Sequence, residues 1–239
     1  MAFAHGKDCE LAVDRYVMTG IFRSAGFSAT VDTAESTVFG LSDKTHAVGQ
    51  RQAAISMDGF YDEGRQVEVE DRLKAAAPFV ATVGPAGLAV GARARLASVV
   101  ATNVATTSGI GDMTLLNWSL LSTDRVGYGW SLSKPTAVVA TTTNGAAVDT
   151  GAAVTGALWT AHFHLHQITA TNGTLKIQGS ADGSTGWTDL TSATSGTLTA
   201  AGAVRVTGTG NTLRYVRGVY TATAGVSASY TIAFARIAP

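Results

Sequence analysis

Residues 27–39 read Phe-Ser-Ala-Thr-Val-Asp-Thr-Ala-Glu-Ser-Thr-Val-Phe, a run that contains neither glycine nor proline. Side chains branched at Cβ recur through it, at Thr30, Val31, Thr33, Thr37 and Val38. Such side chains lose little conformational freedom on a pleated surface and pack well there. The run therefore predicts a long β-strand early in the chain.

Strand patterns flank this run on both sides. In residues 9–14, Leu11 and Val13 share one face while Glu10, Ala12 and Asp14 share the other, and residues 55–60 alternate again. Between the early strands lies a polar stretch with glycines, Gly40–Gln52, which we expect to be a loop long enough to reach a neighbouring molecule. Further strands are predicted at residues 93–104, 113–121 and 128–132, and then throughout the C-terminal third. There, Asp182–Trp187 reads as a turn that returns Trp187 to the core.

One segment departs from the strand pattern, and it predicts a helix over about residues 65–77. Its apolar residues recur at helical spacing, at Val69, Leu73, Ala76 and Ala77. Asp62 and Glu63 precede it, where a helix N-terminus favours negative charge, and Pro78 follows as a stop. The fold class predicted is all-β, mainly an antiparallel sandwich or barrel, with one flanking α-helix.

Residues 135–157 form a low-charge tract rich in Thr, Ala, Val and Gly. This composition fits a linker, an extended arm or an edge strand. A boundary near residue 155 would divide the chain into a β core with the helix and the polar loop, residues 1–155, and a C-terminal β region, residues 156–239.

Composition excludes several classes of partner. Charged residues make up 14% of the chain, whereas about a quarter is usual, and Lys plus Arg equals Asp plus Glu at 17 each. A chain of zero net charge has no long-range field to attract nucleic acid or an anionic membrane. Cys9 is the single cysteine, so no internal disulfide forms, and no apolar run has signal-peptide or membrane-span length. We expect a soluble protein made in a cytoplasm, whose weakly charged surface becomes covered by copies of itself.

The one pattern that suggests metal chemistry is His162-Phe-His-Leu-His166. On a strand, residues two apart share a face, so His162, His164 and His166 form a row that could hold zinc or copper. A straight row converges poorly on one ion, and the favoured interpretation is a partly exposed or intersubunit row that senses pH. The sequence contains no Gly-x-Ser-x-Gly elbow and no phosphate-binding loop. We therefore predict no catalytic residues, no cofactor and no enzymatic activity.

An ordered series of motifs adds a more specific indication. The N-terminal part contains His5-Gly-Lys-Asp8, Tyr16-Val-Met-Thr-Gly20, Asp32–Gly40, Lys44-Thr-His-Ala-Val-Gly49 and Ile55–Tyr61. Later come Gly111–Thr114, Asp124–Gly129, Leu175–Ser184 with Trp187–Leu190, and Arg214-Tyr-Val-Arg-Gly218. In this order the motifs resemble the tail-tube (major tail) proteins of long-tailed, non-contractile bacteriophages, the siphovirus type.

The resemblance implies a fold and an assembly. Proteins of this family have two packed β-sheets with a helix on the flank, and six copies form a ring by continuing sheets between subunits. Rings stack through the N-terminal segment and a loop between early strands, and double-stranded DNA passes through the lumen during ejection. The implied partners are further copies of the chain, the tail terminator, the tape measure and the distal tail proteins. The implied location is the virion tail, after synthesis in the host bacterial cytoplasm.

The same resemblance nominates interface residues at the N-terminus and in the early loop: Phe3, His5, Lys7, Phe39, Leu41, Asp43, Lys44, His46 and Arg51. Lumen-facing side chains are expected to be small, polar or acidic. Two alternatives stay open: another virion β protein, either a tail terminator or a capsid decoration protein, and a metal-binding module or enzyme built on the three histidines.

Overall fold

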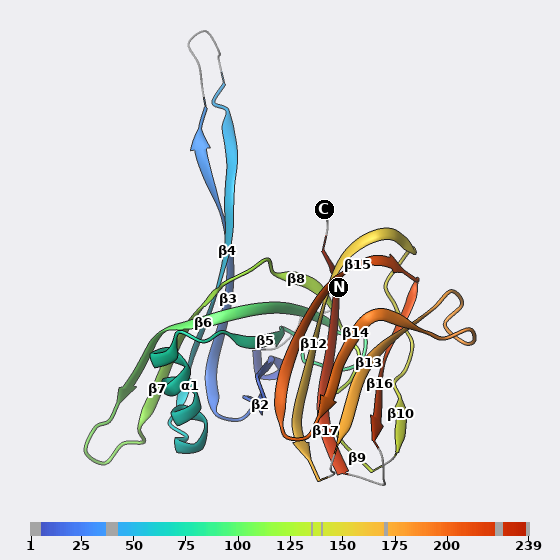
Figure 1. Cartoon of the computed structure of the whole chain (residues 1–239). Helices are drawn as coiled ribbons and strands as arrows, with labels where there is room; N and C mark the ends of the chain where they lie inside the picture. The colour runs from blue at the N-terminus through green and yellow to red at the C-terminus, as the bar shows by residue number, and fades with distance from the viewer. Residues whose placement is uncertain are drawn as a thin grey trace. The chain divides into compact units, whose positions relative to one another are not determined.

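The computed structural model describes residues 6–36, 43–134, 136–139, 141–169, 172–222 and 227–237, with the backbone alone at 136–139 (Figure 1). Antiparallel strands dominate, and α1, Glu63–Ala75, is the only α-helix in these ranges. The predicted all-β class with one helix is therefore confirmed.

Within the described residues, the elements are a short 3-10 helix at Gly6–Asp8, the helix α1 and seventeen strands. The strands are β1 Glu10–Val13, β2 Tyr16–Val17, β3 Phe22–Glu35, β4 His46–Phe60, β5 Phe79–Gly84, β6 Arg93–Thr107, β7 Leu115–Ser122, β8 Gly127–Ser131, β9 Thr136–Val139, β10 Thr142–Asn144, β11 Val148–Asp149, β12 Val154–Ile168, β13 Gly173–Ser180, β14 Thr188–Leu198, β15 Gly202–Thr212, β16 Tyr215–Ala222 and β17 Ser227–Ile237.

The chain divides into two compact units, each built from separate stretches of sequence. Unit 1 comprises Met1–Ile21, Phe79–Ser98 and Val126–Pro239, and unit 2 comprises Phe22–Pro78 and Val99–Arg125. The boundary predicted near residue 155 lies inside unit 1, at the beginning of β12.

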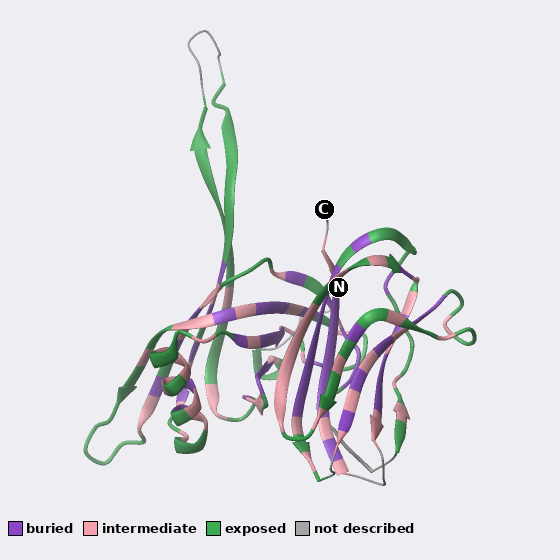
Figure 2. Ribbon diagram, viewed as in Figure 1, coloured by how far each residue is buried: buried purple, intermediate pink, exposed green. Residues whose placement is uncertain are grey.

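Unit 2 is a four-stranded antiparallel sheet in the order β3-β4-β7-β6, accompanied by α1. Burial alternates along β7 and along β4 from Ala53 to Phe60, whereas the outer part of β4 is exposed throughout, as its green ribbon in Figure 2 shows. One face therefore forms the core, and its buried residues are Ile55, Met57, Leu116, Trp118 and Leu120.

The helix begins and ends where its capping residues require. The Asp62 side chain accepts a hydrogen bond from the Arg65 backbone N–H at 3.2 Å, and Ala76 leaves the helix at φ 49°. Val69 is buried as predicted. The predicted apolar face omits Gln66, which is fully buried because its Oε1 accepts a hydrogen bond from the Trp118 indole N–H at 3.0 Å.

Unit 1 contains a β-sandwich. A five-stranded sheet, β10-β16-β13-β14 with β11 beside β16, packs on strands β12 and β17 of the second sheet. The shared core contains residues of both sheets, including Leu175, Ile177, Val216, Phe163, Ile232 and Phe234. The 135–157 tract supplies the edge strand β10, one of the three possibilities its composition allowed.

Trp187 does not return to this core, contrary to the prediction. It is half-buried at the sheet surface, where the Arg217 guanidinium lies 4.3 Å from its ring centroid. The turn before it is rigid because the Asp182 carboxylate accepts hydrogen bonds from the backbone N–H groups of Ser184 and Thr185.

The histidine row of β12 is buried in unit 1, so its predicted partly exposed position is wrong. His162 and His164 are fully buried, and His166 is half-buried. Although β12 and β5 are several strands apart in their sheet, Thr82 of β5 bonds to both His162 and His164. The sheet therefore curls until these two strands face each other.

The hydrogen-bond partners fix the tautomers of the row. His164 Nδ1 lies 2.7 Å from the Asp14 carbonyl oxygen, which only accepts, so Nδ1 carries the proton. Nε2 then accepts from the Thr82 hydroxyl at 2.8 Å, and that hydroxyl oxygen accepts from His162 Nδ1 at 3.0 Å. The chain of bonds is directional, and it requires the His164 ring to be neutral because its Nε2 must accept.

His166 extends this arrangement. Its Nδ1 donates to the Arg15 carbonyl at 2.8 Å, and its Nε2 accepts from the Thr231 hydroxyl at 2.9 Å. The row thus binds β12 to the β1–β2 turn by side chains. No group of three His, Cys, Asp or Glu in the described ranges is placed to hold a metal ion.

Burial lowers the pKa of all three histidines, to about 3 for His164. The Nε2 atom of His162 is buried without a partner, so protonating it would place a charge beside His164 and Arg205. The folded chain therefore resists protons that the same side chains accept freely once it unfolds.

We expect the free energy of unfolding to fall as the pH drops from 7.5 to 5.0. Below the unfolded pKa of about 6.5, each histidine that stays neutral in the folded state costs about 1.4 kcal/mol per pH unit. Urea unfolding at each pH measures this slope. The window lies above the range in which carboxylates titrate, so the histidines dominate it.

The variant His164→Gln lacks one of the three groups and should show a shallower slope over the same window. His46→Gln, which changes an exposed histidine of β4, is the matched control and should keep the slope of the unaltered chain. Equal slopes for all three proteins would contradict the assignment.

Candidate assembly surface

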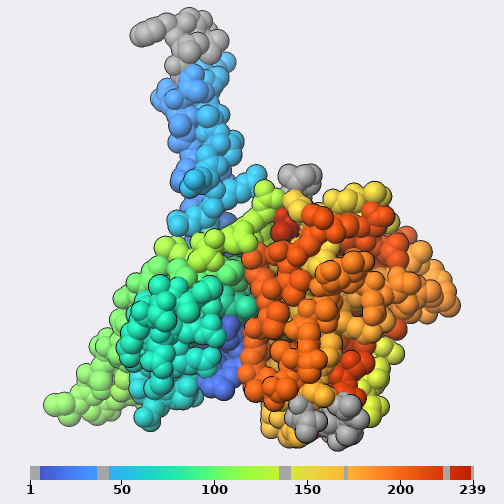
Figure 3. Space-filling model, in the orientation of Figure 1, coloured from blue at the N-terminus to red at the C-terminus, as the bar shows by residue number. Residues whose placement is uncertain are grey.

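A two-stranded ribbon projects from unit 2, and its blue atoms stand out in the space-filling view (Figure 3). The β4–β7 ladder ends at Ala54, and Ala53 next to it is still buried. From Gln52 back to His46, β4 pairs only with β3 in the described ranges (Figure 1). We call residues 30–35 and 46–52 the arm, and every one of them is exposed.

The arm corrects the loop prediction. Gly40–Gln52 was expected to be a loop, but residues 46–52 are strand. The polar composition of this stretch reflects exposure on both faces and not the absence of a ladder, because cross-strand pairing uses backbone groups that any residue except proline supplies.

The register gives the arm two different faces. Directly opposed residues share a face, so Val31 with Arg51 and Thr33 with Val48 lie on one side. The exposed fractions of Val31 and Val48 are 45% and 71%. We call this side, which also carries the opposed pair Glu35 and His46, the valine face. The reverse side is formed by the small or uncharged Thr30, Ala34, Ala47 and Gln52, with Asp32.

The outer end of the arm is held by three bonds between its strands. The Lys44 ammonium lies 3.2 Å from the Glu35 carboxylate, and the Ser36 N–H donates to the Thr45 carbonyl at 2.8 Å. The Ser36 and Thr45 hydroxyls are also bonded, at 3.2 Å. Even so, an isolated two-stranded hairpin is marginally stable in water.

The nominated interface residues fall into three groups. Lys44, His46 and Arg51 come together on or beside the arm, and Asp43 lies exposed next to them. Lys7 is separate, in the short 3-10 helix Gly6–Asp8 of unit 1. Phe3, His5, Phe39 and Leu41 lie outside the described residues. Sequence reasoning did not nominate Val31 or Val48 as interface residues.

The face of the unit 2 sheet opposite the core is small and polar. Its exposed or half-buried residues alternate with the buried ones along each strand, and they are Ser24, Gly26, Ser28, Ser56, Asp58, Asn103, Ala105, Asn117 and Ser119. Asp58 is paired with Arg23 at 2.8 Å. We call this surface the open face.

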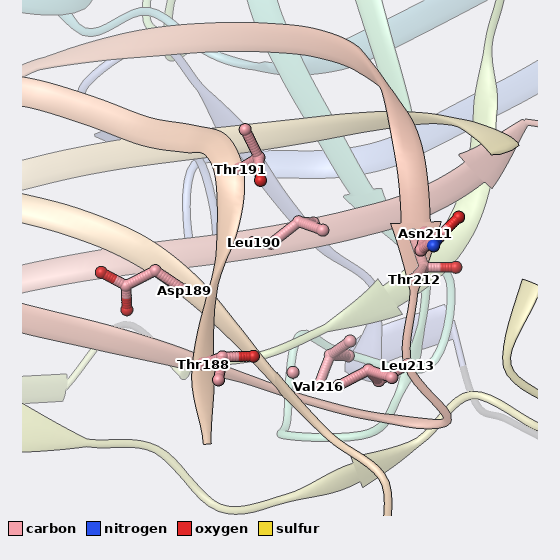
Figure 4. Close-up of a pocket in the computed structure, with 9 residues that line it drawn as sticks. Thr188, Asp189, Leu190, Thr191, Asn211, Thr212, Leu213 and Val216 are labelled. Carbon is pink, nitrogen blue, oxygen red and sulfur yellow. The ribbon is translucent and has the colours of Figure 1, made fainter. Parts of the chain in front are cut away.

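A pocket of about 250 Å³ lies in unit 1, between the beginning of β14 and the β15–β16 turn (Figure 4). Leu190, Leu213 and Val216 form its apolar wall, and threonine hydroxyls stand around it. Asp189 is its one ionisable lining residue, and its carboxylate is bonded to Lys176 and Gln178. The lining therefore supplies no pair of titratable groups for acid–base chemistry.

Comparisons with known proteins give a structural likeness. No family model matches the sequence, and no curated protein matches it. A chain from the virion of the native gene transfer agent particle is 16% identical with a TM-score of 0.45, over 53% of this chain and 98% of that one.

Two further solved structures are similar. The SPP1 tail tube is 10% identical with a TM-score of 0.42, over 51% of this chain and 77% of that one. The SPP1 Dit protein of the hub adsorption apparatus is 12% identical with a TM-score of 0.37, over 96% and 99%. Within the described ranges, no helix has the length and apolar character needed to cross a bilayer.

Because the valine face is exposed in the single chain, the change Val48→Lys should leave the free energy of unfolding within about 0.5 kcal/mol of the unaltered value. Ile55→Ala on the same strand removes a buried side chain and should cost about 2–5 kcal/mol. Urea unfolding of dilute protein compares the two. A loss at Val48 as large as that at Ile55 would show that the arm belongs to the folded core.

Proposed function

We propose that the chain is a structural subunit of a phage tail tube, which assembles into hexameric rings that stack into a conduit for DNA. The observation that carries the proposal is the arm, which is a solvent-exposed β ribbon with two exposed valines on one face and no support from other described strands. The ring, its sixfold symmetry and the passage of DNA follow from the resemblance of the motif order.

An exposed ribbon of this kind favours a partner. Strand edges with unpaired backbone groups pair readily with other chains, and soluble proteins usually protect them. The arm has no proline, and its charged side chains Asp32, Glu35 and Arg51 are spread along its length. Its chemistry suits burial against a second copy of the chain.

The sheet of unit 2 offers a second contact. β3 is an edge strand along its full length in the described structure, because it pairs there with β4 alone. Pairing an edge of one copy with a different edge of the next is a heterologous contact, which closes into a ring when the rotation permits. Ring closure then removes the exposed edges.

The open face suits the lining of a channel for DNA. Serine, asparagine, glycine and alanine are short and uncharged, and the one acidic residue, Asp58, is paired with Arg23. A strongly basic lining would hold phosphates and impede passage. This face matches the small, polar or acidic lumen expected from the resemblance, and it supplies residue names for it.

Residues 156–239 are proposed to complete the tube wall. Their strands β12 and β17 belong to the same sheet as β1 and β5 of the N-terminal part of unit 1. The proposed partners beyond further copies are the tail terminator, the tape measure and the distal tail proteins, and the proposed location is the virion.

Negative-stain electron microscopy of purified protein tests the proposal. Tubes with an open lumen, whose length grows with concentration, are expected. A monodisperse monomer at every concentration would overturn it, and single rings that never stack would favour the tail terminator alternative.

A shortened variant tests the role of the arm. Replacing residues 31–51 by Asn-Gly joins the directly opposed Thr30 and Gln52 through a two-residue turn. The variant should fold, because the removed residues that the structure describes are exposed, but it should form no tubes. Far-ultraviolet circular dichroism confirms folding, and normal tubes from this variant would refute the arm's role in stacking.

A further inference from the structure

The connection between β6 and β7 carries apolar side chains into solvent. In residues 108–114, which we call the tip, Ile110 is fully exposed and Met113 is 66% exposed. Gly109 and Gly111 allow the chain to bend here, but they do not account for the isoleucine between them.

The tip has a defined conformation. The Asp112 N–H donates to the Gly109 carbonyl at 3.2 Å, and the Thr114 hydroxyl donates to Ser108 Oγ at 3.2 Å. Gly111 adopts φ 87°, a conformation that favours glycine. Ile110 is thus presented by a closed turn.

Arm and tip lie at opposite ends of the unit 2 sheet. In the β4–β7 ladder Ala54, next to the arm, pairs with Leu121, whereas Phe60 pairs with Leu115, next to the tip. The β6–β7 ladder ends there too, at Thr107 opposite Leu115. One end of this sheet therefore carries the valine face and the other carries Ile110 and Met113.

We infer that the tip of one copy packs against the valine face of the arm of the next copy in the stack. This inference rests on the proposed function and names the surface that receives the arm. A contact between opposite ends of the same sheet is heterologous, and where its rotation does not close a ring it repeats along an axis, as stacking requires.

The chemistry of the two surfaces is complementary. Exposed aliphatic side chains of the tip meet exposed aliphatic side chains of the arm, Val31 and Val48, and burial of both is favourable. Beside them, Asp112 of the tip can meet Arg51, which shares the valine face. The reverse side of the arm offers no exposed large apolar side chain.

Disulfide cross-linking tests the contact directly. In a Cys9→Ser background, a chain with both Val48→Cys and Ile110→Cys is assembled and then oxidised. Linked multimers should form a ladder on a non-reducing gel, whereas each single-cysteine variant should stay monomeric. Tubes that yield no ladder from the double variant would overturn the inference.

Substitution of the tip gives a second test. Ile110→Asp with Met113→Asp should fold normally by circular dichroism and reduce the mass of pelletable tubes at least tenfold. Val67→Asp changes an exposed apolar residue of α1 in the same unit and should leave tube formation unchanged.

The outcomes separate the two proposals. Normal tubes from the tip variant, alongside tubes from the unaltered chain, would overturn the inference and leave the proposed function standing. Failure of the unaltered chain to assemble at any concentration would overturn the proposed function and the inference with it.

Discussion

Backbone hydrogen bonds between β3 and β4 continue well beyond the last strand that supports them, and the functional surfaces of unit 2 depend on this extension. A β ladder satisfies each strand on one side only, so a two-stranded ribbon leaves an outward row of donors and acceptors on both. Water satisfies them in the single chain. A second copy of the chain can also satisfy these donors and acceptors. Such pairing reduces the conformational freedom of the arm, but it adds the favourable burial of apolar side chains. In the proposed assembly, the arm therefore turns a row of exposed backbone groups in the single chain into an attraction between subunits.

Unit 1, in contrast, is held by hydrogen bonds between its own side chains and backbone. Its curled sheet is fastened by side chains, since Thr82 joins the two buried histidines and the Asp14 and Arg15 carbonyls receive their N–H groups. A buried polar network that is largely satisfied specifies one arrangement, because any slip leaves donors unpaired. Unit 1 thus holds a defined shape without help from another copy, which a repeating subunit needs if every contact along an assembly is to be the same.

The elements that follow from local chemistry were predictable. Alternation placed the strands around Leu11 and Ile55, and Asp62 with the spacing of Val69 placed the helix. Sequence-based predictions of burial failed where contacts between residues far apart in the chain determine it. Gln66 is polar on a helix, and nothing nearby in sequence announces the indole of Trp118 that buries it. The histidines lie on one face as predicted, but the strand that covers them is eighty residues away in sequence.

The candidate surface divides in the same way. Lys44, His46 and Arg51 were named from motif order, and the structure places them on or beside the arm. The stretch around them looked like a loop because the usual mark of a strand is one apolar face against a core, and an arm has no core in the monomer. Val31 and Val48 become significant only once the register shows them on the same side.

The bulge in the arm limits which insertions and deletions the arm can accept during evolution. Between Val31 and Thr33 the register shifts, so that two residues of β4, Gly49 and Gln50, stand opposite Asp32. Outward from the bulge, that one extra residue determines which side of the arm each β4 side chain lies on. Loss of a single residue here would turn Val48 and His46 to the reverse side, whereas a matched change in both strands would only alter the reach. Related chains should therefore vary in arm length by balanced steps, and an unbalanced step should erase the surface while leaving the fold intact.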